Sequence, residues 1–356
     1  MSAEEVLAEI LQQGETEIPL SANQEAILSQ DLLADAERAA AFGITPQTVL
    51  SIVRVRSQHL PQTYALVAPL LPQQPPEPIL TLLWHLWLPL TEQLIAAHQA
   101  LGRPLIQGIL GMQGCGKTTL TTVLCQLLNY LGYSSLSLSI DDLYKTYAER
   151  QTLLRSDPRL IWRGPPGTHD IELGIEILQS LRQGQPPPRG VPRFDKTLYQ
   201  GQGDRTHFEP ITPVDIVLFE GWFVGLTPLP LQVFEHAPAP ITTADDRQFA
   251  LDMNHQLQHY QPLWNCLDRL MILNLADYRL SKIWRTQAEQ AAIAAGKSGM
   301  SDTEVSNFVD YFWRALHPAL FMPALCQDAQ RVSLVIEIKA DHNPGRIYRS
   351  KGVDAD

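Results

Sequence analysis

The segment Gly111–Thr118 contains the residue types that bind a phosphate. Its sequence, GMQGCGKT, fits the pattern G-x-x-x-x-G-K-[ST] and lies between an apolar run and a segment with helical spacing. Glycines let backbone N–H groups surround a phosphate, and the following helix N-terminus adds positive partial charge. Lys117 would neutralise the β- and γ-phosphates of a nucleotide, and the Thr118 hydroxyl would hold Mg²⁺. The residues that we expect to bind the nucleotide are Gly111, Gln113, Gly114, Cys115, Gly116, Lys117, Thr118 and Thr119.

Cys115 lies inside this loop, at the start of the expected helix. A helix N-terminus favours the thiolate, so one interpretation is a redox-sensitive thiol that blocks nucleotide binding when it is oxidised. The other interpretation, which we favour, is a small side chain at an unspecified position of the motif.

Three carboxylates follow two further apolar runs. Asp141 and Asp142 come after SLSLSI, and Glu220 ends DIVLFE. Ligands of open α/β sheets bind outside the carboxyl ends of the strands, so these groups should face the phosphate loop. We expect Asp141 to accept the proton of an attacking hydroxyl group, and Asp141 and Glu220 to face Mg²⁺. Asp142 would serve the metal, the substrate or an N-cap.

Basic side chains cluster between these carboxylates, in RGPPGTHD, PRFDK and GQGDR. A solvated face explains them poorly in a chain of formal net charge −11. A small anionic substrate and a transferring phosphoryl group would both need such cations, and a salt-bridge network is the alternative. The expected substrate-binding residues are Asp142, Tyr144, Arg163, His169, Arg193, Lys196 and Arg205, of which Arg193 and Arg205 join Asp141 and Lys117 as catalytic candidates.

A second basic group follows the fourth apolar run. Arg279, Lys282 and Arg285 are three residues apart and would share a helix face. Such a face can close over the nucleotide phosphates as a lid, which we expect at about residues 276–300, with Arg279 and Arg285 on the nucleotide. A surface basic stripe is the alternative.

Five apolar runs that alternate with helical segments must position these groups. This pattern predicts an α/β fold with a five-stranded parallel sheet flanked by helices, and the phosphate loop with the carboxylates and basic residues makes the P-loop NTPase kinase type the expected one. The two runs that alternate strictly, at 135–140 and 332–338, should lie nearer the edges. We expect an ordered loop at 184–194 and an amphipathic helix at 300–316 with Ser301 as its cap. The expected strands are Leu105–Met112, Ser135–Ile140, Ile216–Phe219, Leu270–Leu275 and Val332–Ile338.

Residues 1–100 form a different region, separate from the kinase domain expected at 101–356. Apolar residues at three- and four-residue spacing predict helices, with Ser21 and Thr45 as N-caps. The region contains neither a phosphate loop nor metal-ligand spacing, so we interpret it as a helical packing region. The expected helices are Ala3–Leu11, Asn23–Ala41, Pro46–Val55 and Leu80–Leu101.

Composition narrows the class of protein. The chain has 356 residues, 45% of them apolar, with 27 Lys and Arg against 38 Asp and Glu, so it can bury a core but lacks the basic balance of a nucleic-acid binder. The richest apolar stretch, Ile79–Leu90, contains His85 and is expected to be a buried helix rather than a membrane span. Four scattered cysteines and an acidic N-terminus favour a reducing, cytoplasmic location.

Taken together, these motifs resemble the plant-type D-glycerate 3-kinase family. The resemblance rests on GMQGCGKTT, SIDDLY, RGPPGTHDIELG, PRFDKTLYQGQGDR, FEGWFVG and ADYRLSKIWRTQAE, in consistent order over about residues 80–340. It implies ATP- and Mg²⁺-dependent phosphorylation of the 3-hydroxyl of D-glycerate in photorespiratory salvage, with Asp141 as base. Arg193 or Arg205, with His169 close, is our choice for the glycerate carboxylate, because the planar fork of arginine matches a carboxylate.

Two alternatives stay open. The first is a related P-loop kinase for another small hydroxyl substrate, such as pantothenate, uridine or a sugar phosphate. The second is a non-catalytic nucleotide-binding regulator, although Asp141 beside the phosphate site is a group that a mere binder does not need. The residues leave open which hydroxyl is phosphorylated and whether the protein is a monomer or a dimer.

Overall fold

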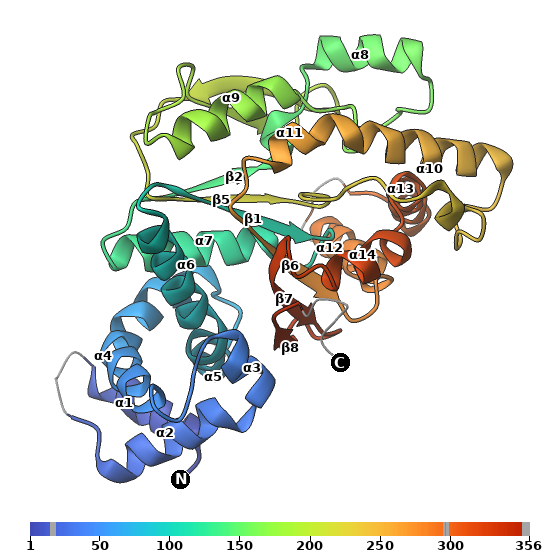
Figure 1. The fold of residues 1–356 in the computed structure, drawn as a ribbon. Coiled ribbons are helices and arrows are strands. Elements are labelled where there is room, and N and C mark those ends of the chain that lie inside the picture. Colours follow the sequence, from blue (N-terminus) through green and yellow to red (C-terminus); the bar gives the residue numbers. More distant parts are fainter. Residues whose placement is uncertain (15–18, 295, 297–298, 351–356) are drawn as a thin grey trace.

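A mostly parallel sheet forms the centre of the molecule. The computed structural model describes residues 1–14, 19–294, 296 and 299–350, and within them the central sheet has six strands in the order β2-β5-β1-β6-β7-β8 (Figure 1). The strands from β2 to β7 pair in parallel, and β8 is antiparallel to β7. The strand bounds are β1 Leu105–Gly111, β2 Ser135–Ser139, β5 Ile216–Gly221, β6 Arg269–Leu275, β7 Val332–Ile338 and β8 Pro344–Tyr348.

The five predicted strands are all present, but two predictions about the sheet region are wrong. The described sheet has six strands rather than five. The prediction missed β8 because this short strand begins with a proline and lacks a strand-like apolar pattern. The expected loop at 184–194 ends early, because β3 (Val191–Asp195) pairs antiparallel with β4 (Asp204–Glu209) in a separate hairpin. Most side chains of this hairpin are partly or fully exposed, so burial left little hydrophobic signal in its sequence.

Helices cover both faces of the sheet. The single helix expected at 23–41 is divided in two at Asp35. The helix expected at 46–55 begins and ends later in the chain. The predicted N-cap at Ser301 is confirmed. Ser21 also caps as predicted, whereas Thr45 precedes a helix that starts four residues later. The α-helices are α1 Ala3–Gln13, α2 Ala22–Ala34, α3 Ala36–Ala41, α4 Val49–Val67, α5 Pro76–Leu82, α6 Leu88–Leu101, α7 Lys117–Tyr130, α8 Tyr147–Ser156, α9 Ile171–Arg182, α10 Ala244–Gln256, α11 Gln261–Trp264, α12 Leu280–Ala294, α13 Asp302–Ala315 and α14 Pro318–Cys326.

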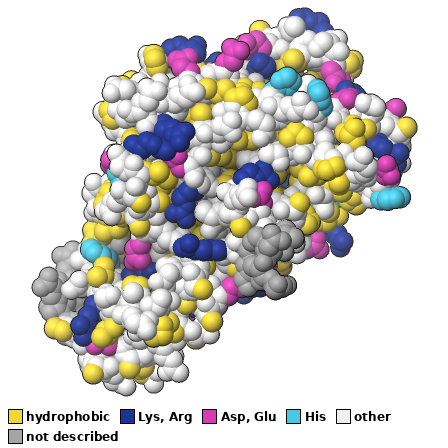
Figure 2. Space-filling view, viewed as in Figure 1, with side chains coloured by type: hydrophobic (Ala, Val, Ile, Leu, Met, Phe, Trp, Pro, Cys, Tyr) yellow, Lys and Arg dark blue, Asp and Glu magenta, His cyan; other side chains and the backbone are white. Residues whose placement is uncertain are grey.

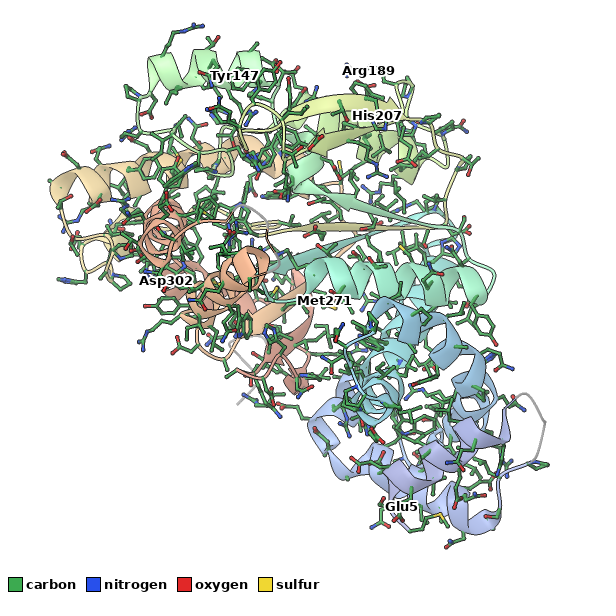
Figure 3. All side chains as sticks on the ribbon, turned by 180° about the vertical axis from the view of Figure 1, so that it is seen from behind. Glu5, Tyr147, Arg189, His207, Met271 and Asp302 are labelled. Carbon is green, nitrogen blue, oxygen red and sulfur yellow. The ribbon has the colours of Figure 1, made fainter. Side chains whose placement is uncertain are left out.

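Each face of the sheet has its own hydrophobic core. One cluster joins α7 and alternate residues of β1 and β7 to helices α1 to α6, and the other joins the opposite residues of the sheet to α9, α10, α11 and α14. The two clusters lie toward opposite ends of the molecule. In Figure 3, Glu5 of α1 lies at one end, and Tyr147 of α8 and His207 of the hairpin lie at the other. Because the first cluster runs continuously from the N-terminal helices into the sheet, the division at residue 100 stays a prediction.

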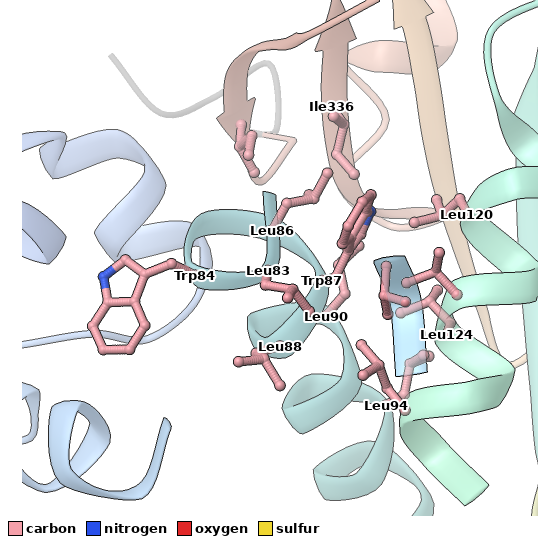
Figure 4. Close-up of a cluster of buried hydrophobic side chains, with 14 of the residues drawn as sticks. Leu83, Trp84, Leu86, Trp87, Leu88, Leu90, Leu94, Leu120, Leu124 and Ile336 are labelled. Carbon is pink, nitrogen blue, oxygen red and sulfur yellow. The ribbon is translucent and has the colours of Figure 1, made fainter. Parts of the chain in front are cut away.

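The apolar stretch at 79–90 is a buried helix, as the sequence predicts. Helices α5 and α6 continue through a π-helical turn at Leu83–Trp87, and the whole span Pro76–Leu101 has the length and composition of a membrane-crossing helix. It is apolar on two sides because it packs in two directions. Trp87 lies toward Leu120 of α7 and Ile336 of the sheet, whereas Trp84 points to the N-terminal helices (Figure 4). Both tryptophans are buried, so the apolar character is explained by packing within the protein.

Ion pairs hold the N-terminal helices at two further places. Inside that region, Arg56 is only 1% exposed and binds Glu92 at 2.6 Å. Between that region and the central sheet, Arg346 of β8 binds Glu37 of α3 at 2.9 Å.

On the outer surface, basic and acidic side chains lie interspersed over the face that Figure 2 presents.

Candidate active site

The phosphate loop connects β1 to α7, as its sequence predicts. Gly114 and Gly116 have φ angles of +79° and +89°, in the left-handed region that favours glycine. A Cβ atom on Gly111 would lie 2.6 Å from the Cys115 sulfur, so a side chain there would force Cys115 to move. Lys117 folds back, and its Nζ donates to the carbonyl of Met112 at 3.0 Å. The loop thereby presents its backbone and Lys117 at the start of α7.

Cys115 fills space inside the loop. Its side chain is buried, and burial raises the pKa of its thiol despite the nearby charge of Lys117. Burial and the raised pKa of the thiol therefore favour the interpretation as a small space-filling side chain over a reactive thiolate.

A cleft of about 1070 Å³ opens beside the phosphate loop, at the carboxyl ends of the strands. Residues from the loop, from the ends of β2 and β5, from the β3–β4 hairpin and from α12 and α13 line it. The lining residues are Gln113, Gly114, Lys117, Thr118, Ser139, Asp141, Tyr144, Trp162, Arg163, Lys196, Thr197, Gln200, Gly201, Glu220, Gly221, Trp222, Arg285, Glu289, Gly299, Met300, Phe308 and Phe312.

Asp141 faces this cleft just after β2. One carboxylate oxygen accepts a hydrogen bond from the Tyr144 hydroxyl at 2.8 Å, and the other binds Lys196 Nζ at 2.6 Å. Burial raises the pKa of Asp141, but the charge and hydrogen bond of Lys196 and the bond from Tyr144 outweigh it, so the pKa lies below its ordinary value. The carboxylate is therefore ionised at neutral pH and able to accept a proton.

The parallel pairing of β2 with β5 brings a second carboxylate to the same place. Ser139 of β2 lies in register with Glu220 of β5, so Asp141 and Glu220 reach the same edge of the sheet. Glu220 is 7% exposed. Burial raises the pKa of Glu220, and the positive charge of Lys117 and the Ser139 hydroxyl oppose this effect.

Asp142 has a different position from its neighbour. It accepts a hydrogen bond from the backbone N–H of Ser139 at 3.2 Å and closes the capping box of the short 3₁₀ turn Ile140–Leu143. Arg193 lies 3.5 Å from the same carboxylate. Of the roles that the sequence left open for Asp142, the structure shows the cap.

The donor set beside Lys117 fits Mg²⁺. Thr118, Asp141 and Glu220 line the same cleft and supply a hydroxyl and two carboxylates, the hard oxygen ligands that this ion prefers. In the described residues there is no cluster of three or more His, Cys, Asp or Glu side chains that could cage a metal. Mg²⁺ needs no such cage, because it retains several waters and is held by one or two carboxylates and substrate phosphates.

The predicted basic residues divide into two groups. Lys196 and Arg163 line the cleft. Arg193 and Arg205 are not among its lining residues in the described chain, and each is held by carboxylates, Arg193 by Glu209 at 2.6 Å and Arg205 by Asp170 at 3.1 Å. These two arginines form the salt-bridge network that was the alternative interpretation. Direct roles for them in binding or catalysis stay predictions.

His169 lies behind Tyr144 rather than in the cleft lining. Its ring stacks on Tyr144 with centroids 4.7 Å apart, and Nδ1 lies 2.8 Å from the Tyr260 hydroxyl. Burial lowers the pKa of His169 to about 3, although the charge of Asp141 opposes this shift. The imidazole is therefore neutral at pH 7 and supports the face of Tyr144 that is turned away from solvent.

The lid region forms a helix, but its basic residues do not share one face. Arg285 lines the cleft, pairs with Glu289 at 2.6 Å and lies over Phe308. Lys282 turns to Asp310 of α13 at 2.6 Å. Arg279 precedes the first turn of α12 and lines a separate cavity, so one face does not carry all three. Closure over the nucleotide stays a prediction.

Several cleft residues were not predicted. An aromatic wall of Trp162, Trp222, Phe308 and Phe312 comes from three separate segments, and only the tertiary structure unites it. Gln200 and Gly201 come from the hairpin loop, where Tyr199 and Gln200 have φ angles of 49° and 58°. The glycines of GQGDR indicate a turn in the sequence. They do not indicate which strand ends this turn approaches in the folded chain.

A phosphate loop, a carboxylate ionised at the carboxyl end of the neighbouring strand and a second acid facing the loop are the groups of a P-loop kinase site. No protein-family model matches the chain. The chloroplastic D-glycerate 3-kinase of Arabidopsis thaliana is 33% identical over 285 residues, which are 74% of this chain and 60% of that protein. The uncharacterized kinase mug58 of Schizosaccharomyces pombe is 33% identical over 219 residues, 59% of this chain and 79% of that protein.

A solved structure agrees with these relatives. The D-glycerate 3-kinase from Cryptococcus neoformans is 25% identical and superposes with a TM-score of 0.65, covering 73% of this chain and 96% of that one. The chain belongs to the family of P-loop kinases that contains these proteins, and it spans 60% of the length of its Arabidopsis relative.

Proposed function

We propose that this protein transfers the γ-phosphoryl group of ATP to the 3-hydroxyl of D-glycerate, giving 3-phospho-D-glycerate and ADP. The observation that carries the proposal is the position of Asp141: it is ionised, and it shares one cleft with Lys117 and Thr118 of the phosphate loop. The acceptor is taken from the family, because the relatives in Arabidopsis and Cryptococcus are named D-glycerate 3-kinases.

In the proposed reaction each residue has one task. Lys117 and the loop N–H groups hold the β- and γ-phosphates, and Thr118 and Glu220 would hold Mg²⁺, which neutralises the charge of the phosphates when bound. Asp141 accepts the proton of the attacking hydroxyl as a bond forms from that oxygen to the γ-phosphorus. The bond from the γ-phosphorus to the bridging oxygen breaks, and ADP carries away the electron pair.

Two broader statements are proposals as well, the first from the family resemblance and the second from the cysteines and the acidic N-terminus. The reaction would serve photorespiratory salvage of glycerate, and it would take place in the cytoplasm. All four cysteines are free, which is compatible with a reducing compartment.

A coupled assay with ATP, Mg²⁺ and D-glycerate tests the function. The product is passed either directly to phosphoglycerate kinase or first through phosphoglycerate mutase. Signal without the mutase is the expected result and identifies the 3-phosphate. Signal only with the mutase would overturn the regiochemistry. Slow ATP hydrolysis that is independent of D-glycerate would favour a nucleotide-binding regulator instead.

A further inference from the structure

We infer that Arg163 is the anchor for the acceptor's carboxylate, and that the acceptor is a small hydroxy acid with one negative charge at that end. The inference rests on the proposed function, because it names the residue that selects the acceptor. It also replaces Arg193 and Arg205, the arginines that the sequence favoured for this role.

The charges in the cleft single out Arg163. Four cationic side chains line the described part of the cleft: Lys117, Arg163, Lys196 and Arg285. Lys196 binds Asp141 at 2.6 Å, Arg285 binds Glu289 at 2.6 Å, and Lys117 belongs to the phosphate loop. For Arg163, the residues that the structure describes offer no carboxylate within ion-pair distance. A charged group beside a cleft with no counter-ion of its own is available to an anionic ligand.

The surroundings of Arg163 hold its guanidinium in place without using up its donors. One Nη donates to the carbonyl of Gly201 at 2.6 Å, and the guanidinium carbon lies 5.8 Å from the Tyr144 ring centroid and 5.5 Å from that of Phe194. In the described chain, no further protein acceptor is found for the other N–H groups. A planar fork held on two rings is oriented in advance for a bidentate carboxylate.

Tyr144 connects this anchor with the proposed base. The Arg163 guanidinium lies over the Tyr144 ring, and the Tyr144 hydroxyl donates a hydrogen bond to Asp141 at 2.8 Å. The cation and the base therefore both contact the same tyrosine side chain. A short acid whose carboxylate and terminal hydroxyl are at opposite ends can reach both groups.

A second arginine adds to the positive charge at this point. Arg150 lies 5.3 Å from the Phe194 ring centroid, so two guanidinium groups flank the same ring. Burial lowers the pKa of Arg150, and the positive charge of Arg163 lowers it further. A monoanion bound to Arg163 would relieve this repulsion. A neutral nucleoside would not.

The test compares the wild-type enzyme with Arg163→Gln, Arg163→Lys and Arg155→Gln. Arg155 is an exposed arginine of α8 outside the cleft and serves as the matched control. KM for D-glycerate, kcat and Kd for ATP are measured for each, together with the thermal unfolding midpoint. We expect Arg163→Gln to raise KM for D-glycerate about 100-fold with Kd for ATP within twofold of wild type, because a charge-assisted bidentate contact is lost. The KM of Arg163→Lys for D-glycerate should lie between those of the wild type and Arg163→Gln, since lysine keeps the charge but lacks the planar guanidinium.

The outcomes separate the two proposals. If the wild-type enzyme does not phosphorylate D-glycerate, the proposed function fails before any variant is compared. If the wild-type enzyme is active and Arg163→Gln has a KM within threefold of it, only the anchor is overturned. If Arg163→Gln does not fold, Arg163→Lys decides, and an unchanged KM in that variant overturns the bidentate anchor.

Discussion

The two halves of the cleft are built in different ways. The nucleotide half comes from one continuous segment, Gly111–Thr118, in which backbone N–H groups and glycine conformations shape the site. The half that we propose for the acceptor, the acceptor half, is assembled from Asp141 after β2, Arg163 before α9 and Lys196 in the β3–β4 hairpin. The first half depends on local geometry, whereas the second depends on three segments that meet only in the folded chain.

This difference has an energetic consequence. In the acceptor half, Asp141 binds both Tyr144 and Lys196, so a change at one residue alters the protonation of another. Effects there should be non-additive, as expected for groups in one network. Substitutions across the two halves should combine more nearly additively, and each of the following experiments tests one side of that contrast.

The largest effect is expected from Asp141→Asn in the acceptor half. The amide has nearly the same shape but cannot accept a proton, so kcat should fall by about 10³-fold. Kd for ATP should stay within about twofold, because the phosphate loop is untouched. Steady-state kinetics and nucleotide titration measure the two quantities, with Asp245→Asn on the exposed side of α10 as the matched control. Retained turnover would remove Asp141 from the role of base.

Lys117→Met should act on the nucleotide half and, unlike Asp141→Asn, change the affinity for ATP. Loss of the cation that faces the phosphates should lower kcat by about 10²-fold and also weaken ATP binding, since Lys117 would bind the phosphates in the ground state and more strongly in the transition state. KM for D-glycerate should change little. The same titrations apply, with the exposed Lys339→Met as control. Unchanged ATP affinity would contradict the assignment of this loop.

Lys196→Gln should move the pH profile. Removing the cation takes away the largest effect that opposes the burial of Asp141, so the pKa of Asp141 rises and a larger fraction of the base is protonated in acid. The acid limb of kcat/KM should therefore shift to higher pH. A pH series with both substrates measures it. A lower rate with an unmoved acid limb would mean that Lys196 acts on substrate and not through Asp141.

Tyr144→Phe should have the smallest effect of the four. It removes one hydrogen bond to the Asp141 carboxylate and keeps the ring, so kcat should fall about fivefold with a smaller rise in the pKa of Asp141. The double variant with Lys196→Gln completes a mutant cycle. Additive free energies in that cycle would contradict the coupling that distinguishes the acceptor half.

Much of the fold followed from local patterns. The five parallel strands, the buried helix at 79–90 and the cap at Ser301 were predictable, because apolar periodicity and capping residues act over a few positions. The sixth strand and the β3–β4 hairpin were not, since their short polar sequences form strands only when a partner supplies hydrogen bonds. The break of the helix at Asp35 was likewise missed, although that aspartate caps α3 through the N–H of Arg38 at 2.9 Å.

For the site, the sequence by itself determined the phosphate loop, because its chemistry lies in the backbone of eight consecutive residues. It also placed Asp141 and Glu220 at strand ends, since parallel strands bring their carboxyl ends to one edge. Only the tertiary structure decided how the cations are used. Arg163, Arg193 and Arg205 are equivalent in sequence, and they differ because the folded chain supplies carboxylates to two of them and leaves the third facing the cleft. An arginine's role depends on which charges the fold brings within a few ångströms of it, and that is a property of distant segments.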